Sequence, residues 1–132
     1  MKRVALVSDY MARDLITLSP QTEINHAMSV LLDNRISGAP VLADDGTLVG
    51  VLSKKDCLKA AMQASYYRSW GSTVEAYMSR DVQTLEAGMD IFEATNAFLE
   101  SSFRRFPVIE DGRLVGQISR ADALRAMKDS WG

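Results

Sequence analysis

Apolar side chains recur at helical spacing in two stretches of the sequence, residues 24–31 and 91–98. In each stretch the positions i, i+3, i+4 and i+7 are apolar, with Thr95 as the one polar exception, so each predicts a helix with one buried face. A short alternating segment precedes each helix, DLITL at 14–18 and DVQTL at 81–85, and both segments predict a strand. Each half of the chain is therefore expected to begin with a strand and a helix.

The first of these helices carries a local start signal. Ser19 can supply a hydroxyl N-cap, and Pro20 fits the first helical turn, where its missing N–H costs no hydrogen bond. This pair predicts a helix that begins directly after Ser19.

A hairpin and a second helix are expected to follow in each half. The runs GAPVLADDGTLVGVLS (38–53) and RFPVIEDGRLVGQIS (105–119) place β-rich segments on both sides of an Asp-Gly pair, which predicts a tight hairpin. The second helices are expected to start at Ser53 and Ser119. Gly71 predicts the end of the helix that begins at Ser53.

The two halves are copies of one another. A shift of 67 residues aligns identical residues between 7–41 and 74–108, and after a one-residue deletion a shift of 66 does so between 45–60 and 111–126. Because the register persists through strands, turns and helices, the pattern indicates a duplication. The expected domains are 7–62 and 74–130, joined by a connector at 63–73, and each is a β-α-β-β-α unit.

Composition narrows the class of protein. The 132 residues are 24% charged and 47% hydrophobic with a net charge of -2, which is typical of a soluble globular protein and gives no global electrostatic reason to bind nucleic acid or a membrane. Cys57 is the only cysteine, so neither an internal disulfide nor a cysteine-based zinc site can form. No secretory signal or membrane-spanning run of about 18 apolar residues is present, so a cytoplasmic protein is expected.

The repeated motifs resemble those of a known family. Each copy has Tyr-Met at its start, Pro-Val after its first helix, and the run Asp-Gly-x-Leu-Val-Gly-x-(Leu/Ile)-Ser-x-x-Asp. This order and spacing, over residues 7 to about 127, is similar to a tandem pair of cystathionine β-synthase (CBS) domains. The resemblance implies an α+β module whose two β-α-β-β-α repeats pack sheet to sheet with pseudo-twofold symmetry and enclose two clefts.

The resemblance also implies a function. It implies a stand-alone regulatory module, not an enzyme, that binds AMP, ADP, ATP or S-adenosylmethionine and modulates an unidentified partner protein. The alternative is a structural adaptor with empty clefts. Since family members commonly pair two modules, a homodimer is expected, and aromatic residues near the connector and the end offer an association surface: Tyr66, Tyr67, Trp70, Tyr77 and Trp131.

The Ser-x-x-Asp motif has two interpretations. On its own it is a capping box, in which the Ser and Asp side chains bond to backbone amides at the helix start. A helix N-terminus also attracts phosphate, and a carboxylate one turn into the helix can accept both hydrogens of a ribose diol. The residues alone leave both interpretations open.

Under the resemblance, Asp56 and Asp122 bind ribose, and Ser53 and Ser119 lie near phosphate. The other repeat then lines each adenine pocket: Thr84, Arg104, Arg105 and Phe106 opposite Asp56, and Thr17, Ser37, Gly38 and Ala39 opposite Asp122. Lys54 and Arg120 are further cations at the helix starts, with exposed first-turn residues as the alternative. Because of its two arginines, the Asp56 cleft is expected to be the more positive. His26 is expected to be exposed, and Asp44-Asp45 to form a turn and no part of a metal site.

Overall fold

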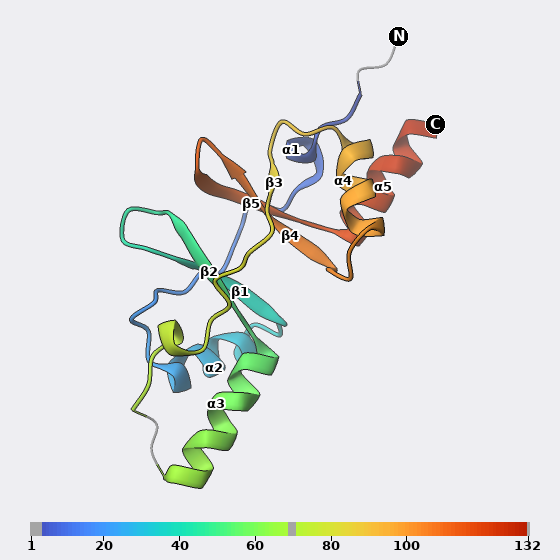
Figure 1. The fold of residues 1–132 in the computed structure, drawn as a ribbon. Coiled ribbons are helices and arrows are strands. Elements are labelled where there is room, and N and C mark those ends of the chain that lie inside the picture. The colour runs from blue at the N-terminus through green and yellow to red at the C-terminus, as the bar shows by residue number, and fades with distance from the viewer. Residues whose placement is uncertain (1–3, 69–70, 132) are drawn as a thin grey trace. The chain divides into compact units, whose positions relative to one another are not determined.

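The computed structural model describes residues 4–68 and 71–131. The chain divides into two compact units (Figure 1): Ile16–Val82 form one, and the residues before Ile16 pack with those after Val82 to form the other. We call them the first-repeat unit and the second-repeat unit, after the hairpin that each contains. The expected α+β class is confirmed, whereas the expected packing of the sheets about a pseudo-twofold axis stays a prediction.

The first-repeat unit packs two helices against a hairpin. Its elements are α2 (Ile24–Asp33), β1 (Gly38–Leu42), β2 (Leu48–Ser53), α3 (Lys54–Tyr67) and a 3-10 turn at Val74–Ala76. Strands β1 and β2 are antiparallel, and the expected helical face of α2 is confirmed, since Ile24, Ala27 and Leu31 are buried. These side chains form one core with residues of both strands and α3.

The second-repeat unit has the same plan with one more strand. Its elements are α1 (Val7–Tyr10), β3 (Leu85–Glu86), α4 (Ile91–Leu99), β4 (Arg105–Glu110), β5 (Arg113–Ser119) and α5 (Arg120–Trp131). Strand β3 runs parallel to β4, and β4 is antiparallel to β5. Figure 1 shows α4 and α5 side by side beside this sheet; α4 buries Ile91, Ala94 and Phe98, and α5 buries Ala123 and Ala126, in one core with residues of the strands.

Both expected hairpins are confirmed, and their turns follow from backbone sterics. Asp111 and Gly112 both have positive φ, 52° and 77°, as the mirror-image turn of a two-residue hairpin requires. The first hairpin has a longer loop in which Gly46 alone takes a positive φ, 87°. The Asp-Gly pair therefore predicts the hairpin correctly in both repeats.

The start of each repeat crosses the hairpin of the other repeat, over a glycine. Met11 and Ala12 cross β5 at Gly116, where an added Cβ would lie 2.6 Å from the Met11 Sδ and 2.8 Å from the Ala12 carbonyl oxygen. Two hydrogen bonds between Ala12 and Gln117, 2.8 and 2.9 Å long, fix this crossing. Met78 and Ser79 cross β2 at Gly50 in the same way. The repeated glycines are therefore needed for close backbone approach.

Three expectations of local structure were wrong. The segment 14–18 is not a strand: Leu18 alone pairs with Val41, and the strand expected at 81–85 is only Leu85–Glu86. These segments meet their hairpins only at their ends, and Ile16 and Thr17 are exposed. Gly71 does not end α3, because the helix ends at Tyr67 and Arg68 takes the left-handed cap position with φ 55°.

The expected N-cap at Ser19 was also wrong. The Ser19 hydroxyl accepts from the Gln21 amide within a turn, and α2 begins at Ile24. The Ile24 amide donates to the Ser72 carbonyl over 3.0 Å, and in the other unit the Ile91 amide donates to the Ala5 carbonyl over 2.9 Å. A distant segment thus satisfies the first amide of each helix, which no local sequence signal indicates.

The crossing predicts a specific stability loss. Gly116→Ala should lower the free energy of unfolding by about 1–3 kcal/mol, because the Ala12 backbone cannot yield to the new methyl group without a shift of the crossing segment. Urea denaturation measures the change. Gly88→Ala is the matched control, since nothing lies within 4 Å of its Cβ position and its φ is not positive. An equal effect of the two substitutions would contradict this account.

Candidate functional site at two helix starts

The first candidate site lies where β2 passes into α3. The Asp56 Oδ2 accepts hydrogen bonds from the Ser53 amide and the Ser53 hydroxyl, each 2.9 Å long. In return the Ser53 Oγ accepts from the Asp56 amide over 3.1 Å. This is a complete capping box, and both side chains remain partly exposed. Within the described part of the chain, the other carboxylate oxygen of Asp56, Oδ1, accepts no hydrogen bond.

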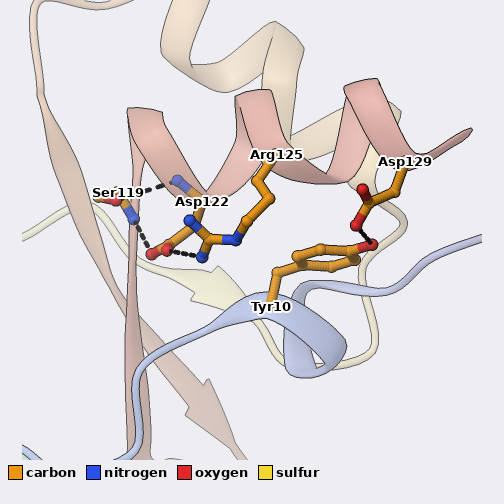
Figure 2. Close-up of polar contacts among 5 residues, drawn as sticks. All are labelled: Tyr10, Ser119, Asp122, Arg125 and Asp129. Atoms are coloured by element: carbon orange, nitrogen blue, oxygen red, sulfur yellow. Dashed lines mark hydrogen bonds and ion pairs between the residues drawn. The ribbon is translucent and has the colours of Figure 1, made fainter. Parts of the chain in front are cut away.

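The same box recurs where β5 passes into α5. The Ser119 amide donates to the Asp122 Oδ2 over 2.9 Å, and the Asp122 amide donates to the Ser119 Oγ over 3.1 Å (Figure 2). Here the second oxygen is occupied, because the Arg125 guanidinium donates to the Asp122 Oδ1 over 2.5 Å. The expected helix starts and caps are confirmed in both units, so the capping interpretation holds whatever else the motif does.

The first amides of both helices are partly used by the protein itself. The Lys54 amide donates to the Ser37 carbonyl over 2.9 Å, and the Arg120 amide donates to the Arg104 carbonyl over 3.0 Å. The Arg120 Nε also donates to the Phe103 carbonyl over 3.0 Å. The third amide of each helix bonds to the capping serine, so two of the first three amides are already paired. Each helix start therefore has fewer free N–H donors for a phosphate than a bare helix end would have.

Strand pairing places the residues before Pro-Val beside the capping box of their own unit. Gly38 lies opposite Ser53, and Arg105 lies opposite Ser119. Ser37, Arg104 and Arg105 are exposed, whereas Ala39 and Phe106 are buried in the cores of their units. Phe106 packs on Phe98 and Phe103 at ring-centre distances of 4.8 and 5.6 Å.

The predicted adenine-lining residues can thus be sorted by exposure. Thr17 is exposed and Thr84 is partly exposed, while the side chains of Ala39 and Phe106 are committed to packing. We expected each set of lining residues to face the aspartate of the other repeat. That arrangement would involve both units, and it stays a prediction.

Comparison with known proteins decides the family. The model of the CBS domain matches the chain twice, at residues 7–63 and 74–129.

The chain belongs to the CBS domain family.

Three relatives show how far the likeness extends. The uncharacterized protein MJ1225 of Methanocaldococcus jannaschii is 26% identical over 125 residues, which are 95% of this chain and 44% of that protein, so the chain spans less than half of that relative. CBSX2 from Arabidopsis thaliana, whose crystal structure was solved in complex with AMP, has 29% sequence identity to this chain. The two structures superimpose with a TM-score of 0.82 over 97% of this chain and 99% of that one. The CBS domain pair of MJ0100, in complex with 5′-methylthioadenosine and S-adenosyl-L-methionine, is 25% identical, with a TM-score of 0.77 over 97% and 99%.

A further candidate in this CBS pair is its single histidine. His26 is exposed, as expected. No group of three or more His, Cys, Asp or Glu residues that could hold a metal ion occurs in residues 4–68 and 71–131. In the same ranges, no helix is long and apolar enough to cross a membrane.

Sequence reasoning missed the tyrosine that anchors the start of each CBS repeat. The Tyr10 hydroxyl donates to the Asp129 Oδ2 on α5 over 2.6 Å (Figure 2). In the other unit the Tyr77 hydroxyl donates to the Gln63 Oε1 on α3, also over 2.6 Å. Asp129 and Gln63 occupy matching positions in the 66-residue repeat, so the repeated Tyr-Met pair was the available signal.

The charged anchor changes the titration of Tyr10. The hydrogen bond to Asp129 raises the Tyr10 pKa above its ordinary value of 10.0, with smaller contributions from burial and from the negative charges of Asp129 and Asp9, while Arg125 lowers it. A raised pKa means that the bond stabilises the fold below pH 10 and that this stabilisation is lost as the pH rises through the pKa of the folded state.

The bond between Tyr10 and Asp129 predicts that the stability cost of losing the Tyr10 hydroxyl depends on pH. The stability difference between the wild type and Tyr10→Phe should be constant between pH 7 and 9 and should shrink above pH 10, about the ordinary tyrosine pKa. Urea denaturation at each pH measures it. Tyr77→Phe is the matched control for loss of a hydroxyl, since its partner is an uncharged amide. A difference for Tyr10→Phe that stays constant up to pH 11 would refute the charged anchor.

Proposed function

We propose that the chain is a non-catalytic regulatory module that binds an adenine nucleotide at its Ser-x-x-Asp motifs. The observation that carries the proposal is the recurrence of one partly exposed capping box at both strand-to-helix junctions. Similarity to CBSX2, whose structure is a complex with AMP, and to MJ0100, whose ligands are 5′-methylthioadenosine and S-adenosyl-L-methionine, supports it. All three ligands carry adenine on a ribose with a free 2′,3′-diol, so a diol acceptor suits each of them.

The chemistry of the motif suits such a ligand. An ionised carboxylate has about four lone-pair sites. The cap contacts of Asp56 use only its Oδ2, which leaves Oδ1 for the two hydroxyls of a ribose. A phosphate beside it would meet the remaining amide of the helix start and the exposed ammonium of Lys54.

We further propose that the ligand carries at least one phosphate group. In the second-repeat unit the backbone brings three arginines, Arg104, Arg105 and Arg120, to the start of α5, because Arg105 pairs with Ser119 and the Arg120 amide bonds to Arg104. The expected place of Arg104 and Arg105 in the Asp56 cleft, and the greater positive charge expected there, stay predictions. Guanidinium groups bind phosphate through paired donors, so AMP, ADP and ATP are the favoured ligands. Binding would regulate a partner protein only through a difference in affinity between two conformations of the module.

Ligand binding predicts a stability gain with a defined residue dependence. At about 100 times its Kd, a nucleotide should add about 2.7 kcal/mol to the free energy of unfolding, seen as a thermal shift with AMP, ADP, ATP or S-adenosylmethionine. Asp56→Ala and Asp122→Ala should each reduce this gain and cost about 1 kcal/mol of stability from the lost cap.

Asp90→Ala is the matched control for a lost cap. Asp90 caps α4 by accepting from the Glu93 amide over 2.9 Å but lies outside both motifs, so this variant should lose stability and keep its thermal shift. A wild-type protein that shows no shift with any of the four ligands would instead favour the adaptor with empty clefts.

We also propose that the chain forms a homodimer through its helices. In the first-repeat unit α2 and α3 border an apolar cavity of about 340 Å³, and the leucines on its rim, Leu32 and Leu58, are about two-thirds exposed. The matching Leu99 and Leu124 of the other unit are also exposed, as are Tyr66, Tyr67 and Trp131, while Trp70 lies outside the described residues. Light scattering at micromolar concentration should report about twice the chain mass of 14.6 kDa, and a monomer would refute the proposal.

A further inference from the structure

The two capping boxes differ in the residue one helical turn beyond the aspartate. Arg125 lies three residues beyond Asp122 and forms an ion pair with it, and the matching position in the first repeat is Lys59, three residues beyond Asp56. Among the residues that the structure describes, Lys59 forms no ion pair with Asp56. Asp56 therefore presents a free Oδ1 to a ligand and Asp122 does not. Both aspartates accept from the amide of their capping serine, and Asp56 also accepts from the Ser53 hydroxyl.

We propose that Arg125 competes with the ribose of the ligand for Asp122, so that Asp56 is the preferred acceptor of the diol. This inference rests on the proposed function and assigns a specificity-determining role to Arg125. A diol needs carboxylate oxygens that point away from the cap, and in Asp122 the oxygen that does so is Oδ1, to which Arg125 donates.

The competition is reversible because of where Arg125 lies. Its side chain is 55% exposed, whereas that of Asp122 is 16% exposed. The guanidinium can therefore return to water at little cost, and the carboxylate cannot. Figure 2 shows Arg125 reaching along α5 to Asp122, beside Tyr10, with no other side chain of the group bonded to its guanidinium. A ligand that displaces it loses part of its binding free energy but is not excluded.

Two reciprocal exchanges test the role of this position. In a protein that carries Asp56→Ala, so that Asp122 is the remaining acceptor, Arg125→Lys should tighten binding of AMP and of adenosine by about threefold to fivefold, the size expected for a partly exposed ion pair. In a protein that carries Asp122→Ala, Lys59→Arg should weaken both ligands by a similar factor. Isothermal titration calorimetry measures each affinity, and circular dichroism confirms that each variant is folded.

The choice of ligands and residues separates the explanations. Arg125→Lys and Lys59→Arg both keep the charge of the side chain. Because adenosine has no phosphate, a change in the affinity for both AMP and adenosine identifies competition for the ribose acceptor. An effect on AMP alone would mean that Arg125 contacts phosphate and would overturn the inference, as would unchanged or weaker binding by Arg125→Lys. If the wild type binds neither AMP nor adenosine, the proposed function fails and this inference fails with it. If the wild type binds and only the exchanges have no effect, this inference alone fails.

Discussion

Each unit depends on a backbone crossing that only glycine permits. Met11 and Ala12 pass over β5 at Gly116, and Met78 and Ser79 pass over β2 at Gly50, each at distances that leave no room for a Cβ. Directly before each crossing segment lies the tyrosine that bonds to α5 or α3. These are the helices whose first turns hold the Ser-x-x-Asp motifs, so the crossing fixes the helix that carries each candidate site.

The elements that the sequence predicts correctly are those set by neighbouring residues. The Asp-Gly hairpins and the helix starts at Ser53 and Ser119 depend on turn sterics and capping within a few positions. The start of α2 is different, because its first amide bonds to the Ser72 carbonyl, far along the chain. A serine followed by proline therefore indicated an N-cap at Ser19 that the tertiary structure did not use.

The candidate site also combines features that a local pattern reveals with features that only the structure shows. Ser53, Asp56, Ser119 and Asp122 could be found because the motif is written twice and has a direct physical meaning at a helix start. The ion pair of Arg125 follows helical spacing, yet many surface pairs at that spacing contribute nothing, and only the structure shows that it takes the free oxygen of Asp122. The commitment of Phe106 to the core likewise depends on Phe98, which a local pattern does not reveal.

The central claim is that the two capping boxes also bind a nucleotide. The most direct test follows backbone amide signals by nuclear magnetic resonance while AMP is added to the wild-type protein. The account predicts saturable shifts centred on the amides of Lys55 and Asp56 and on the matching amides of Ala121 and Asp122, in the first turns of α3 and α5. Saturable shifts confined to other parts of the chain, or no shifts at millimolar AMP, would contradict it and leave the Ser-x-x-Asp motifs as helix caps alone.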